Sequence, residues 1–518
     1  MATYSIVEYF DDHDGYKCGY CKGENSAFSQ GMWAHSLNVE DYQALIDRGW
    51  RRSGKYCYKP TMRKTCCPQY AIRCNVQKFR LSKSKKKVAK RMQRFLLNGE
   101  RKGDVSNSTT SKDDLDVNFS PAKEECIQCQ EVDSNNANIE TIITTPDVTH
   151  TECTADEPTT SKCEKQEVSD TNTSGKKLKT KSTKEPEKGA GADPSKPKCK
   201  KAKLLRLERK MAKLQDRGEN PELLVQKTQE AKSLDDFLPH LHSLPNAKHK
   251  LEIRLVSTAK DNEEFHQTRQ ESLKLYQKYQ MAVHGDTLND CTDQQWTRFL
   301  VDTPLNRDPK GPGQGYGSFH NQYWLDDNLL AVGVVDVLPS CVSSVYVYYD
   351  PDYAFLSLGV YTALSEIALT RKYHKRFSGL LHYYMGFYVH SCPKMRYKGA
   401  YDPSDLLCPE TYTWVPLPVC ASTLSQTSYA RLNVLNGGSP DAVDKEGQIS
   451  NLNAVRCLYR RGITDYVAYK LHKYMISQNS RFLARTTTEE DEKVLEYSSF
   501  VGKTCAQRML LYRSASDE

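Results

Sequence analysis

The sequence predicts an α+β fold, with a mixed β-sheet flanked by helices, a small N-terminal cysteine-rich module and a long disordered linker. Three observations carry this prediction: paired cysteines near the N-terminus, a polar middle tract, and a C-terminal half in which strand and helix periods follow one another. The expected divisions are 10–80 for the cysteine module, 81–102 for a basic helix, 103–197 for the linker, 198–244 for a second basic helix with its own linker, and 245–515 for the large domain.

Composition limits the class of protein. Of the 518 residues, 27% are charged, and the mean hydropathy is −0.69, so part of the chain cannot be packed. No run approaches the roughly 18 apolar residues of a membrane span, and the N-terminus lacks the regions of a signal peptide. We therefore expect a soluble, cytoplasmic protein without a membrane partner, in which the 18 cysteines are metal ligands or core residues.

Four cysteines form the most specific local pattern. Cys18 and Cys21 make a tight C-x-x-C pair, and the adjacent Cys66 and Cys67 follow about one small subdomain later. Soft metals bind thiolates from such a pair and a second short segment. Because zinc ribbons normally close with a second C-x-x-C, the irregular second half leaves room for an iron–sulfur cluster, with zinc as the alternative. Buried free cysteines are the other explanation.

The N-terminal module and the middle of the chain contain three predicted helices and one predicted linker. Residues 38–49 have the signals of a capped helix, with Asn38 at its start and Gly49 at its end. Residues 83–97 form a helical pattern with a dense basic face. The tract at 103–195 has too few large apolar side chains to offset its ordering entropy. A second basic amphipathic helix is expected at 198–214.

The large domain begins with a strand-like period near residue 251 and a helical period at 265–280. Three strands are then predicted within 316–325, 329–338 and 341–349, followed by a loop and a helix from Leu358. This order is the central unit of GNAT-type N-acyltransferases, in which the helix N-terminus receives the phosphates of an acyl carrier. The loop at 355–359 has one glycine and bulky neighbours, and therefore leaves little space for the pyrophosphate of coenzyme A.

With both halves considered, the chain resembles the arginyl-tRNA--protein transferases. The motifs that carry the resemblance lie at 18–21, 31–36, 47–55, 66–70, 316–320, 343–346 and 349–359. The resemblance implies an aminoacyltransferase that moves arginine from arginyl-tRNA to proteins with N-terminal Asp, Glu or oxidised Cys, which marks them for ubiquitin-dependent degradation. It also favours an iron–sulfur cluster at the four cysteines.

The chemistry of such a transfer needs positioning more than activation. An aminoacyl ester is already activated, and the acceptor α-amine has a reference pKa of roughly 7.7 to 8.0. His320, His390 or a tyrosine–water relay through Tyr346 are candidates for proton transfer. For both histidines, a hydrogen-bonded structural role is the alternative.

Two sets of charged residues are candidates for substrate binding. An extended segment would place Lys394, Arg396 and Lys398 on one side, as a cationic pocket for the acceptor's acidic group. Solvated edge charges are the alternative. The donor's guanidinium needs a carboxylate, for which the candidates near the strand-to-helix junction are Asp336, Asp350, Asp352 and Glu366. Asp350 and Asp352 can instead shape the turn around Pro351.

Binding of tRNA should combine phosphate contacts with aromatic stacking, because the acceptor end is single-stranded. The candidate residues are Lys274, Tyr276, Lys278, Tyr279, Tyr316 and Ser318, with Tyr276 and Tyr279 equally suited to a core. The basic runs at 85–87 and 200–201 can hold the stem by charge or act as nuclear-import signals, which extends the expected localisation to the nucleus. No DNA partner is expected. An acetyl-CoA-dependent N-acyltransferase and a metal-dependent RNA-binding adaptor are the competing hypotheses.

Overall fold

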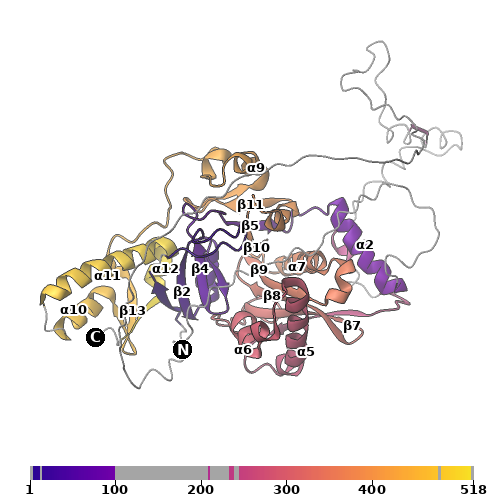
Figure 1. Ribbon diagram of the computed structural model, residues 1–518, viewed down its shortest axis with the longest axis horizontal. Coiled ribbons are helices and arrows are strands. Elements are labelled where there is room, and N and C mark those ends of the chain that lie inside the picture. The colour runs from indigo at the N-terminus through magenta and orange to yellow at the C-terminus, as the bar shows by residue number, and fades with distance from the viewer. Residues whose placement is uncertain are drawn as a thin grey trace, which may run out of the picture. The chain divides into compact units, whose positions relative to one another are not determined.

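The computed structural model of the protein describes residues 4–11, 14–99, 208–209, 233–238, 244–476 and 480–514 (Figure 1). The predicted linker at 103–197 lies outside these residues, as does the predicted basic helix at 198–214 except for two of its positions. No helix among the described residues is long and apolar enough to cross a membrane.

The described strands form two mixed sheets. A seven-stranded sheet has the order β14-β13-β15-β1-β2-β4-β3, and an eight-stranded sheet has the order β12-β11-β5-β10-β9-β8-β7-β6. The strands of the first sheet are β1 Ile6–Phe10, β2 Ser29–Ser36, β3 Arg51–Ser53, β4 Tyr56–Pro60, β13 Arg456–Tyr459, β14 Gly462–Asp465 and β15 Leu510–Arg513. Those of the second are β5 Tyr70–Asn75, β6 Leu251–Ser257, β7 Gly317–Leu325, β8 Asn328–Val337, β9 Cys341–Tyr349, β10 His382–Tyr388, β11 Ser404–Leu407 and β12 Trp414–Pro416.

Both sheets combine strands from the two ends of the chain. Strand β5, which follows the cysteine pairs, lies between β10 and β11 in the second sheet. In the first sheet, the C-terminal strand β15 pairs in parallel with β1 and with β13. The N-terminal module and the C-terminal domain are therefore built into each other, and the division of the chain at 80 and 245 stays a prediction.

The described helices cover these sheets. Their bounds are α1 Val39–Ile46, α2 Lys83–Asn98, α5 Glu263–Tyr279, α6 Asp293–Trp296, α7 Leu358–His374, α8 Pro393–Arg396, α9 Leu417–Gln426, α10 Tyr466–Ile476, α11 Ser480–Val501 and α12 Lys503–Arg508. The predicted Asn38 stands at the N-cap of α1, although its side chain makes no capping hydrogen bond, and this helix ends at Ile46, before Gly49. Helix α2 begins at a Ser82 side chain that accepts from the Lys85 N–H and ends at the left-handed Gly99.

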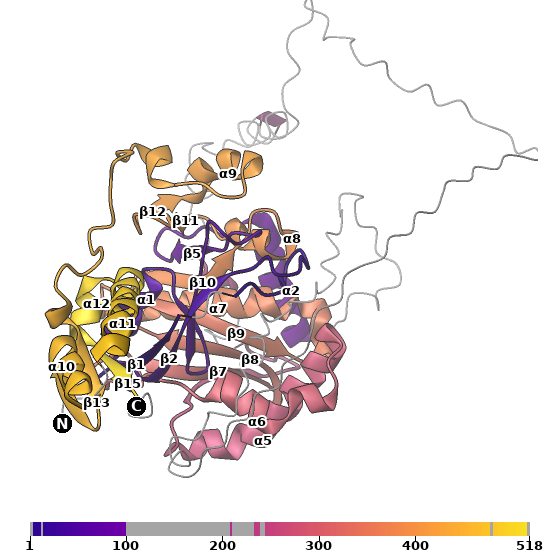
Figure 2. The same cartoon turned by 60° about the vertical axis from the view of Figure 1, so that its left-hand side comes forward.

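The predicted order of strand, strand, strand, loop and helix is confirmed in the second sheet. Strands β7, β8 and β9 are antiparallel neighbours, and α7 then leads to β10, which pairs in parallel with β9. Side chains alternate between the faces: Val332 and Val334 pack with α5, whereas Val335 and Val337 belong to the core shared with α7 and α2. Figure 2 shows α5 and α6 on one side of this sheet and α7 on the other.

The segment after β10 differs from its prediction. Residues 394–398 were expected to be extended, but α8 and the 3₁₀ helix η8, Tyr397–Ala400, turn this segment into two helical turns. Pro393 is the physical reason, because it occupies the first position of α8, where its fixed φ favours a helix start. Lys394, Arg396 and Lys398 therefore do not share one side of a strand.

Helix α2 covers the loop that precedes α7. Arg91 Nη1 donates to the Phe355 carbonyl oxygen at 2.6 Å and to Ser357 Oγ at 3.1 Å. Phe95 packs edge-on against Tyr353 and Phe355. In a coenzyme A-dependent enzyme of this fold the carrier's phosphates would bind at this helix N-terminus. Side chains of α2 fill the position instead.

Candidate functional site

The two parallel strands β9 and β10 separate partway along their length. They pair as far as Ser343 and Tyr384, and β10 then continues beside β5. Each strand has an irregularity at this point: Val345 is the extra residue between β9 positions paired with Val334 and Val335, and β10 shifts register between Tyr384 and Phe387. Beyond Ser343, the described residues offer the β10 side of β9 no ladder partner, so backbone groups on this edge are available to a ligand.

A pocket of about 250 Å³ lies in this opening. Its walls come from both strands, from α7, from the segment at 392–401, from β3 and β4, and from the cysteine loop. The lining residues with polar or charged groups are Tyr20, Lys22, Tyr42, Arg51, Arg52, Ser53, Tyr58, Ser343, Ser344, Tyr346, Thr362, Glu366, Tyr383, Lys394, Tyr397, Lys398 and Tyr401. Five of these side chains are cationic and one is a carboxylate.

Glu366 supplies that carboxylate from α7. Its side chain is buried, and the Tyr383 hydroxyl donates to Oε2 at 2.5 Å. Burial raises the pKa of Glu366 to about 7, although hydrogen bonds from Tyr383 and Ser344 favour the ionised form. Gly333 leaves room for the carboxylate, since a Cβ there would lie 2.3 Å from Glu366 Oε1. A carboxylate poised near neutral pH in a polar pocket is typical of a functional site.

Arg51 supplies a buried cation. It is 6% exposed, and its guanidinium donates to the carbonyl oxygens of Trp50 and Ile46 at 2.6 and 3.1 Å, and weakly to that of Gly386 at 3.4 Å. Its Nε has no hydrogen-bond partner, and no carboxylate of the described residues forms an ion pair with it. A buried guanidinium that carbonyl oxygens hold in place, without a carboxylate in ion-pair contact, can bind an incoming anion.

Arg52 is already neutralised. Its Nε and Nη2 donate to the two carboxylate oxygens of Asp336 at 2.8 and 2.6 Å, and Nη2 also reaches Ser318 Oγ at 3.1 Å. Ser318 in turn donates to Asp336 at 2.7 Å. The predicted guanidinium partner Asp336 thus binds an arginine of its own chain, and the predicted tRNA contact Ser318 belongs to the same buried group.

Two of the three predicted acceptor-binding cations line the pocket, and the third does not. Lys394 and Lys398 line the pocket, and Lys398 Nζ donates to the Phe387 carbonyl oxygen at 3.1 Å. Arg396 is exposed and is not among the lining residues.

Of the three predicted proton-transfer residues, Tyr346 lies in the pocket. Its hydroxyl donates to Gln280 Oε1 at 2.8 Å and lies 3.5 Å from His284 Nε2. His320 is fully buried away from the pocket lining, with Nε2 3.0 Å from the Leu300 carbonyl oxygen, and burial lowers its pKa to about 4. His390 bridges Tyr388 and Ser425 at 2.7 and 2.9 Å, also outside the lining. The placement of the histidines lends no support to their catalytic assignment.

The remaining predicted contacts lie outside the pocket. Lys278 forms ion pairs with Asp350 at 2.6 Å and Asp352 at 2.8 Å, so a predicted tRNA contact and two predicted arginyl contacts bind each other. Lys274 is exposed on α5. Tyr276 and Tyr279 are 4% and 2% exposed in the core, which leaves neither ring a face for a base.

Tyr316 is partly buried and packs edge-on against Phe377. It does not line the pocket either.

The predicted basic face of α2 is present in part. Lys83, Lys87, Lys90 and Arg94 are exposed and are spaced by three and four residues, so they form one stripe along the helix. Lys85 is buried instead: its Nζ donates to the Ala400 carbonyl oxygen at 2.7 Å, and burial lowers its pKa to about 8. The expected role of Lys85 in holding an RNA stem by charge is therefore wrong for this residue.

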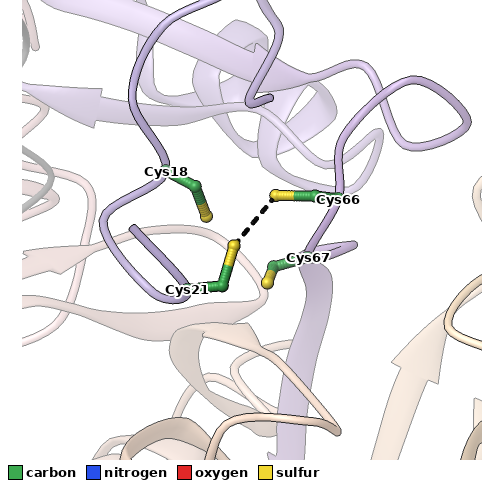
Figure 3. Close-up of side chains that lie close together, drawn as sticks. All are labelled: Cys18, Cys21, Cys66 and Cys67. Carbon is green, nitrogen blue, oxygen red and sulfur yellow. Dashed lines mark hydrogen bonds between the residues drawn. The ribbon is translucent and has the colours of Figure 1, made fainter. Parts of the chain in front are cut away.

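The four cysteines converge as the spacing predicts (Figure 3). All four Sγ atoms lie within 4.8 Å of one another, with Cys21 and Cys66 3.3 Å apart. The Gly23 N–H donates to Cys21 and is the main cause that lowers the pKa of this thiol to about 7. A tetrahedral ion at about 2.3 Å from each thiolate would set the sulfurs about 3.8 Å apart, so the arrangement fits a metal-binding site.

Several pocket residues escaped the sequence analysis, above all Arg51, Tyr20 and Lys22. The available signal for Arg51 was its position directly after Trp50 at the start of a short strand, since a charged pair beside a buried tryptophan is unusual. Tyr20 and Lys22 stand between and beside the metal-binding cysteines, where the spacing pattern drew attention to the thiols alone.

Comparison with known proteins assigns the chain to a family. Residues 16–87 match the family "Arginine-tRNA-protein transferase, N terminus", and residues 271–408 match "Arginine-tRNA-protein transferase, C terminus". Arginyl-tRNA--protein transferase 1 of Drosophila melanogaster is 41% identical over 511 residues, which cover 98% of this chain and 99% of the fly protein. Arginyl-tRNA--protein transferase 2 of Arabidopsis thaliana is 35% identical and covers 80% of this chain and 76% of its own length.

A bacterial protein matches a smaller part of the chain. Aspartate/glutamate leucyltransferase of Pseudomonas syringae is 35% identical over 150 residues, which cover 29% of this chain and 56% of the bacterial protein. The two family matches, together with the 41% identity to the fly protein over 98% of this chain, show that the chain belongs to the arginyl-tRNA--protein transferase family.

Proposed function

We propose that this protein transfers arginine from arginyl-tRNA to the α-amino group of proteins that begin with Asp, Glu or oxidised Cys. The observation that carries the proposal is the charge arrangement of the pocket, in which one carboxylate and several cations line the same opening of the sheet. A cationic arginyl donor and an anionic acceptor require these two signs side by side. The bacterial leucyltransferases that match part of the chain are named for aspartate and glutamate, which supports acidic acceptors.

The donor's guanidinium binds Glu366 in this proposal. Glu366 is the one carboxylate among the pocket-lining residues, whereas Asp336 is paired with Arg52, and Asp350 and Asp352 with Lys278. A planar guanidinium and a carboxylate form two parallel charge-assisted hydrogen bonds, which distinguish arginine from lysine. Tyr383 and Ser344 hold the carboxylate in position for this contact.

The acceptor's acidic side chain binds the cations on the other walls. Arg51 is buried without an ion-pair partner, and Lys394 and Lys398 come from α8 and η8. A carboxylate or sulfonate held by these groups brings the adjacent α-amine toward the edge of β9. The exposed Arg396 remains in the proposal as a contact at the rim.

The reaction forms one bond and breaks one. The acceptor's unprotonated amine attacks the ester carbonyl carbon, the C–N bond forms, and the C–O bond to the tRNA ribose breaks. A proton leaves the nitrogen and one reaches the departing ribose oxygen. We assign this exchange to a water held by the Tyr346 hydroxyl, and stabilisation of the tetrahedral oxyanion to backbone N–H groups on the unpaired edge of β9.

The body of the tRNA binds by charge. The exposed stripe of Lys83, Lys87, Lys90 and Arg94 belongs to α2, which packs beside α7, and Lys274 is exposed on α5. Sequence-independent phosphate contacts of this kind suit an A-form stem. Tyr276, Tyr279 and Ser318, which are buried, are not needed for this contact.

The four cysteines hold the metal centre that the family resemblance implies. The thiolate set fits an iron–sulfur cluster or a single zinc ion, and the short sulfur–sulfur distances also suit one tetrahedral ion. An iron–sulfur cluster is the proposal. Visible absorption of anaerobically purified protein, combined with iron and sulfide analysis, tests it; a colourless protein with one equivalent of zinc would contradict it.

The product of the transfer marks proteins for ubiquitin-dependent degradation in this proposal. The activity belongs to the cytoplasm and the nucleus, and no disulfide joins the described cysteines, which is compatible with a reducing compartment. Fractionation of cells that express the tagged protein, with detection in both compartments, checks the location.

The proposed reaction is tested by supplying tRNA charged with labelled arginine and a peptide that begins with Asp. Label should enter this peptide, and should not enter the same peptide with an N-terminal acetyl group or with Lys in place of Asp. Transfer to the acetylated peptide, or equal transfer to the Lys peptide, would contradict the proposed acceptor.

A further inference from the structure

The cysteine knuckle, residues 18–23, borders the pocket in addition to carrying two of the four thiols. Gly19, Tyr20 and Lys22 line the same cavity as Glu366 and Arg51. The metal-binding loop is therefore part of a pocket wall, rather than a remote structural element.

The local geometry ties Tyr20 and Lys22 to the thiols. The Lys22 N–H donates to the Cys18 carbonyl oxygen at 2.9 Å, and the Cys18 N–H donates to the Gly23 carbonyl oxygen at 2.9 Å. Lys22 has a left-handed φ of 66° at the point where the loop reverses. Because Tyr20 lies between Cys18 and Cys21, and Lys22 directly follows Cys21, binding of the thiolates to a metal fixes both residues.

The knuckle also packs against the segment that carries another pocket cation. Cys18 and Cys67 form a small buried cluster with Val389, and Tyr20, Cys392 and Met395 pack against it. Cys392 and Met395 line the pocket as well, and Lys394 stands between them. The knuckle, residues 18–23, and the segment at 392–395 thus form one continuous wall of the pocket, which we call the thiol wall.

The charges of the thiol wall indicate which substrate it serves. Lys22, from the knuckle, and Lys394, from α8, both line the pocket, whereas the carboxylate of Glu366 comes from α7. A cationic arginyl group is repelled by the two lysines, and an acidic acceptor is attracted by them.

We propose that the thiol wall binds the acceptor, with Lys22 contacting the acidic N-terminal residue and Tyr20 the peptide behind it, and that metal binding at the four cysteines holds Lys22 and Tyr20 in this position. The inference rests on the proposed function, because it assigns the acceptor side of that reaction. The affinity for the acceptor then depends on the metal centre, whereas the affinity for arginyl-tRNA does not.

Binding measurements on full-length protein test the assignment of Lys22. A fluorescent peptide that begins with Asp reports acceptor affinity by anisotropy, and filter binding reports affinity for arginyl-tRNA. Lys22→Met should weaken peptide binding about tenfold, since a charge-assisted contact is lost, and should leave arginyl-tRNA binding unchanged. Lys22→Arg should retain most of the peptide affinity.

Lys17→Met is the matched control. Lys17 lies just before the knuckle, pairs with Glu24 at 2.6 Å and does not line the pocket. Its removal should change neither affinity. Peptide affinity that is equal in Lys22→Met and wild type, at equal metal content, would overturn the assignment.

A separate variant tests whether acceptor binding depends on the metal centre. Cys66 is exposed and is not a lining residue, so Cys66→Ser removes a ligand without removing a pocket contact. Metal content and peptide affinity should fall together, while arginyl-tRNA affinity stays constant. An equal loss of both affinities would overturn the proposal. If wild-type protein binds the peptide but transfers no arginine to it, the proposed function fails instead.

Discussion

Arg52 and Asp336 form a fully buried, two-pronged ion pair that joins the seven-stranded sheet to the eight-stranded sheet. Arg52 comes from β3 and Asp336 from β8, 284 positions further along the chain. The relative exposures of the two side chains are 1% and 0%. The pair fixes the position of the neighbouring Arg51 beside the opening between β9 and β10, and it removes Asp336 from the carboxylates that a substrate can reach.

Replacing one partner of this pair should be severely destabilising. In Arg52→Met the Asp336 carboxyl stays buried without its cation, and we expect the free energy of unfolding to fall by about 3 to 5 kcal/mol. Urea unfolding followed by circular dichroism measures the change. As a control, Arg63→Met breaks an ion pair with Glu410 in which the arginine side chain is 71% exposed, and should leave stability within experimental error. An Arg52→Met protein as stable as wild type would show that the pair does not hold the sheets together.

The raised pKa of Glu366 predicts a pH dependence of stability. Burial raises this pKa from 4.5 to about 7, so between these values the folded protein binds a proton that the unfolded chain has released. The contribution of Glu366 to stability is therefore present below pH 4.5 and is lost as the pH rises to about 7, with a total of about 3 kcal/mol. The variant Glu366→Gln has no ionisable side chain at this position. Its free energy of unfolding should therefore fall less than that of wild type between pH 4.5 and 8.

Urea titrations of both proteins at a series of pH values check this expectation. The quantity to compare is the difference between the two unfolding free energies at each pH. If that difference does not change between pH 4.5 and 8, the carboxyl of Glu366 does not titrate near neutrality.

The exposed stripe of α2 predicts a salt-dependent contribution to tRNA binding. Replacing Lys83, Lys87, Lys90 and Arg94 by Gln should weaken tRNA binding and flatten the plot of log affinity against log salt concentration by about 3, because each lost phosphate contact removes a released counterion. The affinity for the acceptor peptide should not change. Lys85→Gln should instead reduce stability, because the Lys85 side chain is buried between α2 and Ala400. A salt slope identical to that of wild type would exclude the stripe from the tRNA interface.

Local sequence patterns predicted the local parts of the fold. The strand and helix periods of 251–374 gave the order β6, α5, β7, β8, β9 and α7, because period and capping are encoded by neighbouring residues. The insertion of β5 between β10 and β11 has no such signal, since pairing between distant strands is decided by tertiary packing. The helical segment at 393–400 was missed because the alternating charges obscured the helix start at Pro393.

The candidate site was predictable to a similar extent. The four thiols converge because their spacing is set by metal chemistry, and Glu366, Tyr346, Lys394 and Lys398 were named from charge and position. The position of Arg51 depends on hydrogen bonds to backbone carbonyls, including one from a distant strand. The availability of Asp336 depends on a partner 284 positions away in the chain. No local sequence pattern reveals either contact. Charge alone therefore identified the types of group in the pocket, but not which of them were already paired.

Separate binding of donor and acceptor by charge is tested by a paired measurement of KM for arginyl-tRNA and for an Asp-initiated peptide in Glu366→Gln and Arg51→Met. We expect Glu366→Gln to raise KM for arginyl-tRNA about tenfold or more and to leave KM for the peptide unchanged, and Arg51→Met to do the reverse. If both substitutions raise KM for the same substrate, the pocket does not separate donor from acceptor by charge.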